Sequence, residues 1–81
     1  SAPLNRAYLS KLNEAEKLIL TVSSTREISP SDPELQARLE VGRPRLSKLF
    51  QELKINVFLK VRNEWRTRFF KLTEEALDVL R

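Results

Sequence analysis

The spacing of apolar residues changes after Leu53, and this change constrains the fold more than any other feature of the sequence. Before that residue, apolar side chains recur every three or four positions, as on one face of an α-helix. From Ile55 to Leu72, apolar and aromatic residues alternate with polar ones, as in a half-buried β-strand. The sequence therefore predicts helices first and a β-hairpin after them.

The length and composition predict one small domain. The chain has 81 residues, of which 41% are hydrophobic and 32% charged, as in a small globular protein. Its longest apolar runs, such as Leu18–Leu20, are far shorter than the roughly 20 residues of a membrane span, and no signal-peptide pattern opens the chain. We expect a single domain over residues 1–81, with an N-terminal extension at 1–11 and a core at 12–81. We expect no membrane partner and a cytoplasmic or nucleoid-associated location.

Missing residue types exclude most enzyme classes. The chain has no cysteine and no histidine, which removes disulfides, thiol chemistry, the usual general base and the commonest metal ligand. Its single glycine leaves no glycine-rich phosphate loop. We predict that the protein is not an enzyme and needs no cofactor or metal ion. Capping and the helix dipole explain the acidic residues near expected helix starts, which are Glu14, Glu16, Asp32 and Glu34.

The first helical stripe lies between Leu9 and Val22. Asn13 and Glu16 have the spacing of a capping box, so a helix can begin there after a shorter one near residues 3–11. One bent helix fits the same pattern, and the sequence leaves both arrangements open. Ile28 follows the serines and threonine that end this segment, and we expect it in a brief strand or an extended link.

Two breaks that contain proline delimit the next two helices. The segment Ser29–Pro33 stops any helix and starts a new one at about 33–40, with Ser31 or Asp32 as its N-cap. Gly42, the only glycine, predicts a tight turn or a residue with positive φ. A third helix follows, with Pro44 in its first turn. The residues expected to face inward are Leu35, Ala37 and Leu39 in the second helix, and Leu46, Leu49, Phe50 and Leu53 in the third.

We expect the hairpin at about 55–72, with Phe58 and Phe69 facing out of the sheet as an apolar patch. Its loop lacks Asn-Gly and Asp-Gly, which predicts three to five loop residues rather than two. For Trp65 in this loop, three roles remain open: packing beneath the hairpin, stacking on a sugar or base, and contact with a protein. Thr73 is expected to cap a last helix.

Three stretches together resemble the MarR-like winged-helix regulators. Glu34–Leu53 resembles a helix-turn-helix, Arg66–Ala76 resembles the second wing strand and the following helix, and Leu12–Glu16 resembles the start of the first core helix. The resemblance covers residues 12–81. It implies an α+β, mainly helical winged helix-turn-helix with a three-helix core, a two-stranded β-hairpin wing and a C-terminal helix. The helix-turn-helix at about 33–53 would read DNA.

The sequence departs from the MarR-like pattern at two turns. Gly42 stands where serine is usual, which removes a side-chain cap, and Asn56-Val57 stands where glycine usually joins the third helix to the wing. The flanking helices that dimerise full-length regulators of this family do not fit in 81 residues. The candidate for a homodimer contact is therefore the amphipathic N-terminal helix within residues 3–24.

Positive charge is concentrated in one part of the sequence. Residues 41–72 hold nine Lys or Arg and two Asp or Glu, whereas the whole chain has a formal net charge of +4. Such a concentration is typical of a surface that binds a polyanion, although a solvated basic surface also explains it. On the first interpretation, the third helix enters the major groove of double-stranded DNA and the wing contacts the backbone or minor groove. The candidate DNA-binding residues are Arg43, Pro44, Arg45, Ser47, Lys48 and Gln51 on the helix, and Arg62, Asn63, Arg66 and Arg68 on the wing.

Three functions remain compatible with the sequence. The first is sequence-specific or shape-specific binding of duplex DNA, by a transcriptional regulator or by the DNA-binding domain of a larger protein. The second is a protein-protein interaction through Phe58, Trp65 and Phe69, since one fold hosts many functions. The third is the DNA-binding domain of a plasmid replication or partition protein, which would use the same contacts as the first.

Overall fold

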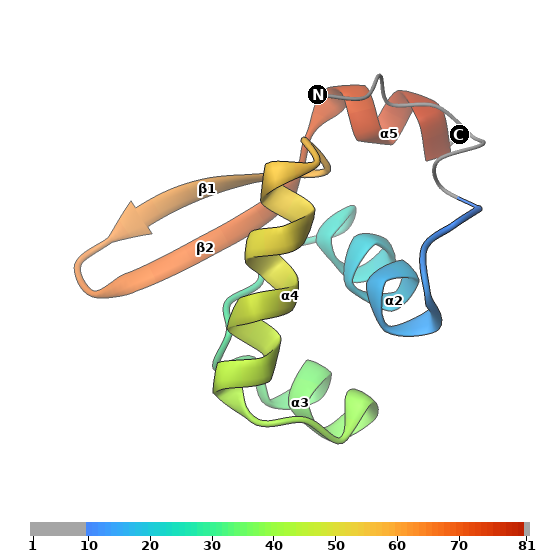
Figure 1. Ribbon diagram of the computed structural model, residues 1–81. Helices are drawn as coiled ribbons and strands as arrows, with labels where there is room; N and C mark the ends of the chain where they lie inside the picture. The colour runs from blue at the N-terminus through green and yellow to red at the C-terminus, as the bar shows by residue number, and fades with distance from the viewer. Residues whose placement is uncertain (1–9, 81) are drawn as a thin grey trace.

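The computed structural model describes residues 10–80, without the side chain of Leu80 (Figure 1). These residues form four helices and one two-stranded antiparallel sheet, which confirms the predicted mainly helical α+β architecture. The helix expected near residues 3–11 lies outside the described residues. In chain order the elements are α2 (Glu14–Ser23), α3 (Pro33–Leu39), α4 (Arg43–Ile55), β1 (Leu59–Glu64), β2 (Thr67–Leu72) and α5 (Glu74–Leu80).

A reciprocal pair of side-chain caps begins α2. The side chain of Asn13 accepts a hydrogen bond from the backbone N–H of Glu16 at 2.8 Å. The Glu16 carboxylate in turn accepts one from the N–H of Asn13 at 3.1 Å. This is the predicted capping box, which satisfies two of the N–H groups that a helix start leaves open. Because residues 10–13 are not helical, α2 is a helix of its own rather than the end of a bent one.

The turn between α3 and α4 differs in one respect from expectation. Asp32 rather than Ser31 caps α3, because its carboxylate accepts a hydrogen bond from the N–H of Leu35 at 3.0 Å. At its other end α3 closes with Glu40 in the left-handed conformation, at a φ of 54°. Of the two alternatives for Gly42, positive φ is wrong: Gly42 lies in the short connection between the helices with a φ of −87°, as the N-cap of α4 without a side-chain hydrogen bond.

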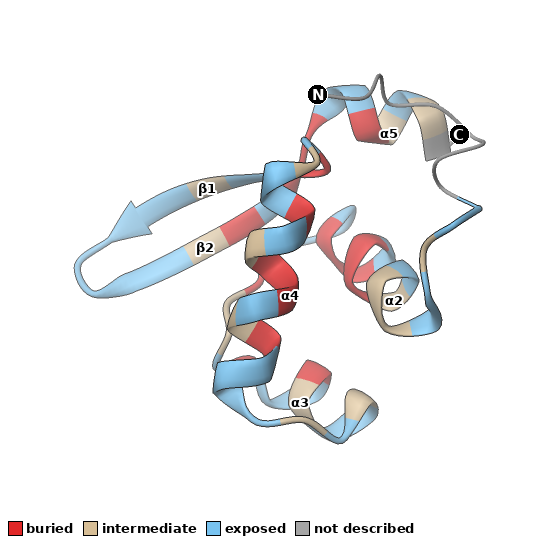
Figure 2. Cartoon of the chain, in the orientation of Figure 1, coloured by how far each residue is buried: buried red, intermediate tan, exposed pale blue. Residues whose placement is uncertain are grey.

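The core lies between the helices and the root of the hairpin (Figure 2). Phe50 of α4 and Phe70 of β2 meet edge to face, with ring centroids 5.0 Å apart and an interplanar angle of 62°. The prediction that Ala37 faces inward is wrong. Ala37 is exposed because it lies two residues from buried Leu35, on the opposite side of the helix. The buried hydrophobic residues are Ile19, Leu20, Val22, Ile28, Leu35, Leu46, Leu49, Phe50, Leu53, Phe58, Leu59, Phe70, Leu72 and Ala76.

The hairpin begins later than the sequence predicts. Helix α4 continues to Ile55, and strand alternation applies only from Leu59 onward. Between them Val57 has a φ of 65°, which interrupts the alternation and turns two consecutive residues, Phe58 and Leu59, inward. Phe58 is fully buried, so the expected outward patch of Phe58 and Phe69 does not form.

The hairpin turn is also shorter than predicted. Glu64 pairs with Thr67, which leaves only Trp65 and Arg66 in the turn. Trp65 has a φ of 57°, a conformation that glycine or asparagine usually adopts. Because neither residue of the turn is glycine or asparagine, the sequence does not indicate a two-residue turn. The side chain of Trp65 is 98% exposed, which excludes packing beneath the hairpin.

Two contacts fasten the hairpin to the helices at its root. Ile28 forms an isolated bridge with Phe70 through N–H···O bonds of 2.9 and 2.7 Å, which confirms the brief extended segment. The Thr73 hydroxyl donates to the carbonyl of Val57 at 2.8 Å and accepts from the N–H of Ala76 at 3.2 Å, so Thr73 caps α5 as predicted. Beyond this root the hairpin extends away from the helices (Figure 1).

Candidate nucleic-acid interface

The exposed side of α4 follows from the position of its buried residues. Four apolar residues of α4 face the core. At about 100° per residue, Pro44 and Lys48 project from the side of α4 that lies opposite the core, and Gln51 lies at the edge of this side nearest the hairpin. Arg43 and Ser47 lie on the flank of α4 that faces the hairpin, where they line a groove. The sequence of α4 therefore presents one outer surface and one hairpin-facing flank.

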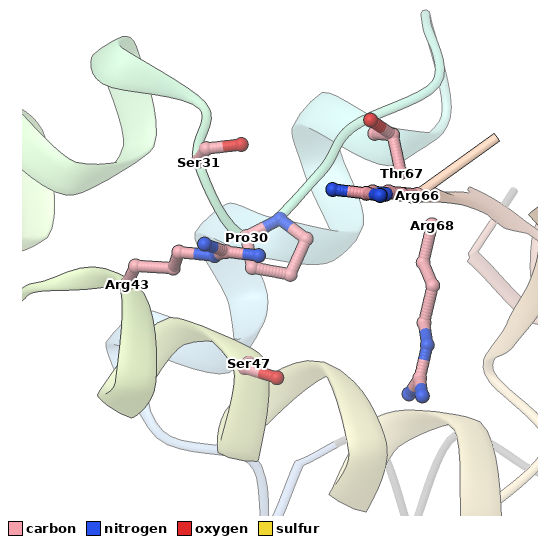
Figure 3. Close-up of a pocket in the computed structure, with 7 residues that line it drawn as sticks. All are labelled: Pro30, Ser31, Arg43, Ser47, Arg66, Thr67 and Arg68. Atoms are coloured by element: carbon pink, nitrogen blue, oxygen red, sulfur yellow. The ribbon is translucent and has the colours of Figure 1, made fainter. Parts of the chain in front are cut away.

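The first groove runs between the start of α4, the loop before α3 and the tip of the hairpin (Figure 3). Its volume is about 330 Å³. Figure 3 shows Arg43 from one side and Arg66 from the other, extending toward the space between them. The groove is lined by three arginines (Arg43, Arg66 and Arg68), three hydroxyl residues (Ser31, Ser47 and Thr67) and Pro30.

The second groove continues the first along α4. Its volume is about 340 Å³, and Arg68 lines both grooves. Across the two grooves, the hairpin-facing flank of α4 lies opposite the face of the hairpin that carries Arg68. We call the residues that line them the α4–wing surface. The second groove adds Gln51 and Lys54 from α4, and Val61 and Asn63 from β1.

Arg62 lies on the other face of the hairpin and is held by acids. It pairs across the strands with Phe69, on the face opposite to that of Arg68. The Arg62 guanidinium contacts Glu27 at 2.9 and 3.1 Å and Glu64 at 2.7 Å, and it lies 4.8 Å from the ring centroid of Phe69. The hydrogen bond with Glu27 and then that with Glu64 raise the pKa of Arg62, and the hydrogen bond from Arg62 lowers the pKa of Glu27. The structure thus separates Arg62 from the wing residues with which the sequence grouped it.

The remaining cations of this region form no ion pair with an acid among the described residues. Within residues 10–80, no ion pair involves the Lys or Arg side chains of α4 or of the α4–wing surface. Pro44, Arg45 and Lys48 are exposed on α4 but line neither groove. Of the sequence-predicted site residues, the structure brings together Arg43, Ser47, Gln51, Asn63, Arg66 and Arg68. It leaves Pro44 and Lys48 on the outer side of α4 and Arg45 on the flank away from the hairpin.

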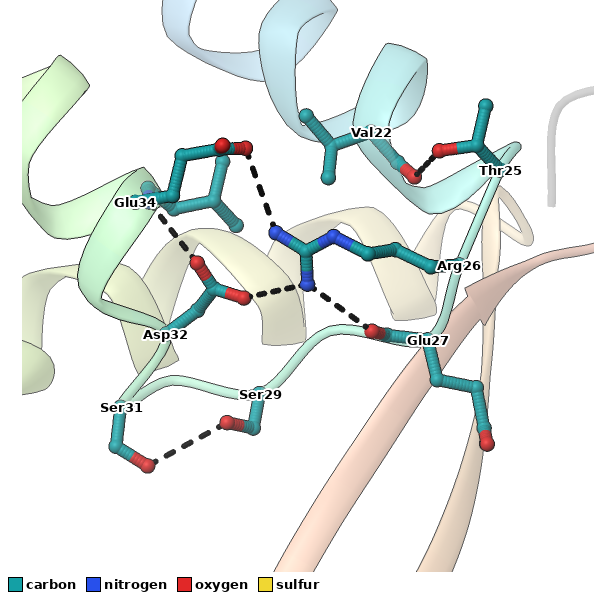
Figure 4. Close-up of polar contacts among 9 residues, drawn as sticks. Val22, Thr25, Arg26, Glu27, Ser29, Ser31, Asp32 and Glu34 are labelled. Carbon is teal, nitrogen blue, oxygen red and sulfur yellow. Dashed lines mark hydrogen bonds and ion pairs between the residues drawn. The ribbon is translucent and has the colours of Figure 1, made fainter.

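A cluster of charges fixes the loop that carries Ser31 (Figure 4). Arg26 contacts Asp32 at 2.6 Å and Glu34 at 3.4 Å, while Asp32 also caps α3. The hydrogen bond from Arg26, and the smaller one from the N–H of Leu35, lower the pKa of Asp32, although burial of the carboxylate opposes them. The same contact raises the pKa of Arg26. This cluster ties the loop to α3 and so holds one wall of the first groove in place.

Sequence reasoning missed five residues of the α4–wing surface, which are the apolar Pro30 and Val61 and the polar Ser31, Lys54 and Thr67. Lys54 follows Ser47 and Gln51 at the spacing of one helix flank, so extending that periodicity by one turn finds it. Ser31 and Thr67 carry no comparable signal, because the fold brings them to α4 from separate segments of the chain.

The acidic residues of the described part do not form a metal site. Residues 10–80 contain no group of three or more His, Cys, Asp or Glu side chains placed to hold a metal ion. No helix in that stretch has the length and apolar character needed to cross a membrane. The two grooves are lined by cations, hydroxyls and amides, a set of donors suited to anions.

Solved structures resemble this fold, although no family model and no curated protein matches the sequence. Adhesin competence repressor (AdcR) from Streptococcus pyogenes matches with a TM-score of 0.72 and 23% identity, over 91% of this chain and 56% of that one. HlyU from Vibrio cholerae matches with a TM-score of 0.70 and 28% identity, over 91% of this chain and 78% of that one. ZitR from Lactococcus lactis matches with a TM-score of 0.72 and 19% identity, over 98% of this chain and 56% of that one.

These matches establish the architecture. AdcR, HlyU and ZitR have winged-helix folds, and this chain superposes on them over most of its length. The chain spans little more than half the length of AdcR and ZitR. In the described residues, α2, α3 and α4 precede the hairpin and α5 follows it. The fold is therefore a winged helix-turn-helix, as the sequence predicts.

Proposed function

We propose that the protein binds double-stranded DNA through the α4–wing surface and the outer side of α4, as the DNA-binding domain of a transcriptional regulator similar to the MarR-like family. In this arrangement α4 lies in the major groove, and the hairpin contacts the adjacent backbone or minor groove. One matched structure is named a repressor, and this chain spans 56% of it. The proposal therefore concerns DNA binding rather than the whole regulatory response.

The observation that carries the proposal is the set of unpaired cations on both sides of one groove. Arg43 of α4 lies across the first groove from Arg66 and Arg68 of the hairpin, and the hydroxyl residues Ser31, Ser47 and Thr67 also line this groove. Guanidinium groups donate in a fork that matches phosphate oxygens, and hydroxyls add further donors. A backbone phosphate of DNA is the ligand that best fits this chemistry.

The outer side of α4 is suited to base edges. The major groove of B-DNA is about 12 Å wide and admits one α-helix. Lys48 can donate to the acceptors of guanine, and Gln51 can bond the adenine edge with both ends of its amide. The side-chain oxygen of Gln51 is buried and has no hydrogen-bond partner within the described residues. An outward rotation of Gln51 would give this oxygen a donor on the DNA.

The protein-interaction alternative loses most of its proposed contact residues. Phe58 is fully buried, and the Arg62 guanidinium lies over Phe69, so only Trp65 of that set is freely exposed. A plasmid replication or partition protein would use the same DNA contacts, so the test below applies to it as well. A DNA-bound protein of either kind would act in the cytoplasm or in association with the nucleoid.

We also propose that a homodimer would pair through the N-terminal segment, residues 3–24, without the residues of α2 that lie in the core. The apolar residues of α2 itself, Ile19, Leu20 and Val22, are buried in the core of the domain and are not available for pairing. A molecular mass from light scattering, measured with and without duplex DNA, tests whether two copies associate.

The DNA-binding proposal is tested by the fluorescence anisotropy of a labelled random-sequence duplex over a range of salt concentrations. The Kd should rise steeply with salt, because neutralised phosphates release counterions. Arg68→Gln removes the cation shared by both grooves. It is expected to raise the Kd by about 5- to 100-fold and to lower the salt slope by about 1.

Lys71→Gln is the matched control. It removes the same charge from the same strand, but Lys71 lies on the face away from the two grooves, beside the start of α5. It should leave the salt slope unchanged. Equal effects of the two substitutions would contradict the assigned surface, and failure of the parent protein to bind duplex DNA would contradict the proposed function.

A further inference from the structure

Trp65 is the most exposed of the large apolar side chains that the structure describes. It is 98% exposed, against 73% for Ile55 and 42% for Val57. It lies in the turn at the far end of the hairpin, which extends away from the helices in Figure 1. An indole that contacts nothing gains no stability from burial, so the fold gives no reason for a tryptophan at this position.

The backbone at Trp65 also disfavours a tryptophan. The turn has two residues. The first, Trp65, has a positive φ, and the second, Arg66, does not. This combination of signs is that of a type II′ turn, in which glycine is preferred at the first position. A bulky residue with a φ of 57° is strained, so the backbone gives no reason for a tryptophan in this turn. Both the backbone and the solvent exposure would be better served by glycine.

The charges next to Trp65 indicate which ligand its indole meets. Arg66 follows it in the turn and Arg68 lies near by on β2, and neither forms an ion pair within residues 10–80. The nearest acid along the chain, Glu64, is already paired with Arg62. An indole beside unpaired arginines fits a polyanion that also offers flat apolar faces. Nucleic acid meets both conditions, because its bases stack on aromatic side chains.

The hairpin is long enough to carry the indole to a groove. Val61 and Phe70 form the last cross-strand pair that packs against the core. Three further pairs lie beyond it. At about 3.3 Å per residue they place the turn roughly 10 Å past the core. The minor groove of B-DNA is about 6 Å wide and 7.5 Å deep. With α4 in the major groove, the hairpin can cross the intervening backbone and bring Trp65 into the minor groove.

We infer that Trp65 is a stacking residue of the wing, whose indole enters the minor groove and stacks against a partly unstacked base step. The inference rests on the proposed function, since α4 and the cations of the α4–wing surface must hold the duplex. Insertion costs least at flexible pyrimidine–purine steps such as TA. Trp65 therefore adds a preference for deformable sequence at a position that α4 does not read.

Trp65 is the only tryptophan of the chain, so tryptophan emission reports on the wing tip alone. In one titration of the whole protein, anisotropy of a labelled duplex detects binding and tryptophan emission detects contact by Trp65. Emission should be quenched in step with the rise in anisotropy, because stacking on bases quenches indole. The quenching should be stronger with a duplex rich in TA steps than with one of equal length built from stiff A-tracts.

Trp65→Gly separates the contact from stability. It suits the backbone of the turn, so the variant should melt at a temperature no lower than the parent. It should bind duplex DNA at least about fivefold more weakly, with an unchanged salt slope because the indole carries no charge. Trp65→Phe keeps a smaller ring and should recover part of the affinity. Val57→Gly is the matched control, since it also replaces an apolar residue at positive φ but at the root of the hairpin, and it should leave the Kd unchanged.

The outcomes distinguish this inference from the proposed function. Binding by anisotropy with unchanged emission, together with a parental Kd for Trp65→Gly, would overturn the role of Trp65 and leave DNA binding by α4 intact. Absence of duplex binding in both readouts would remove both proposals. An emission change with phosphatidylglycerol vesicles but not with duplex DNA would assign the indole to a membrane surface and also overturn the inference.

Discussion

The N-termini of α3 and α4 are neighbours in the chain, yet they are built in opposite ways. Helix α3 has a charged cap, Asp32, and an acidic residue in its first turn, Glu34, and both contact Arg26. Helix α4 begins at Gly42 without a side-chain cap. Its first turn holds no acidic residue and carries Arg43 and Arg45 instead.

In the proposed complex, this difference gives the two helices different roles: α3 supports the structure beside the first groove, and α4 binds the DNA. The N-terminus of a helix carries a partial positive charge, which acidic side chains stabilise and cationic ones do not. Helix α3 satisfies that charge from within the chain and so anchors the loop beside the first groove. Within residues 10–80, helix α4 has no side-chain cap at its positive end and its arginines form no ion pair. In the proposed complex, a DNA phosphate supplies an anion at this end.

The largest expected change in the free energy of unfolding is for substitutions of Asp32, the cap of α3. Asp32→Ala removes both the cap of α3 and the partner of Arg26, and it should lower the free energy of unfolding by about 1–3 kcal/mol. Asp32→Asn keeps an oxygen that can cap the helix and loses only the negative charge, so it should cost less. Urea unfolding followed by circular dichroism measures both variants. An alanine variant as stable as the parent would show that α3 does not depend on its cap.

A smaller effect is expected from acid. The pKa of Asp32 is held below its ordinary value of 3.8, first by the hydrogen bond from Arg26. A carboxylate with a lowered pKa in the folded state stabilises the fold above its unfolded pKa. That contribution is lost as the pH falls through the folded pKa. The free energy of unfolding should therefore hold steady down to about pH 4 and decrease below it.

Substitutions of Asp32 and Glu27 test whether these two carboxylates cause the loss of stability in acid. Asp32→Asn should flatten the acid dependence, because the group that titrates is gone. Glu27, whose pKa is lowered chiefly by Arg62, should contribute in the same direction, so Glu27→Gln is a second variant to measure. A parent-like pH profile in both variants would mean that these ion pairs do not set the acid response.

The smallest effect on stability is expected at Gly42, where a cap can be added to α4. A Cβ atom there would lie 3.6 Å from Cδ of Pro44, an ordinary contact, and the φ of −87° suits any residue. Gly42→Ser should therefore raise the free energy of unfolding by a few tenths to about 1 kcal/mol. Gly42→Asp should stabilise α4 similarly, but it places a negative charge beside Arg43 and should weaken DNA binding.

Urea unfolding and duplex anisotropy on both Gly42 variants complete the comparison. The serine variant should gain stability and keep its affinity, whereas the aspartate variant should gain stability and lose affinity. Equal affinities for the two variants would mean that the positive end of α4 does not face the DNA.

Features set by residues close together in the chain were predictable from the sequence. The capping box of Asn13 and Glu16 and the cap provided by Thr73 are confirmed, because each depends on side chains within one helical turn. The buried stripe of α4 is confirmed for the same reason, since one period defines it.

Features set by single backbone conformations were not predictable. Val57 and Trp65 both adopt positive φ, although neither residue type favours it. Val57 shifts the start of the hairpin and turns Phe58 inward, and Trp65 shortens the turn to two residues. The length of this turn sets the cross-strand register, and the register places Arg62 and Arg68 on opposite faces of the hairpin. Of the candidate site, the helix residues followed from periodicity, but the division of the wing between two faces did not.

The way the hairpin is fastened has a mechanical consequence. The bridge between Ile28 and Phe70 and the contact of Phe70 with Phe50 clamp the hairpin near its base, and nothing in the described chain supports it past Arg62. Beyond Arg62, the end of the hairpin is held by the pairing of its own two strands. Bending this end would break no interior packing. In the proposed complex, the same domain could therefore follow duplexes of different curvature and groove width while its interior stays unchanged.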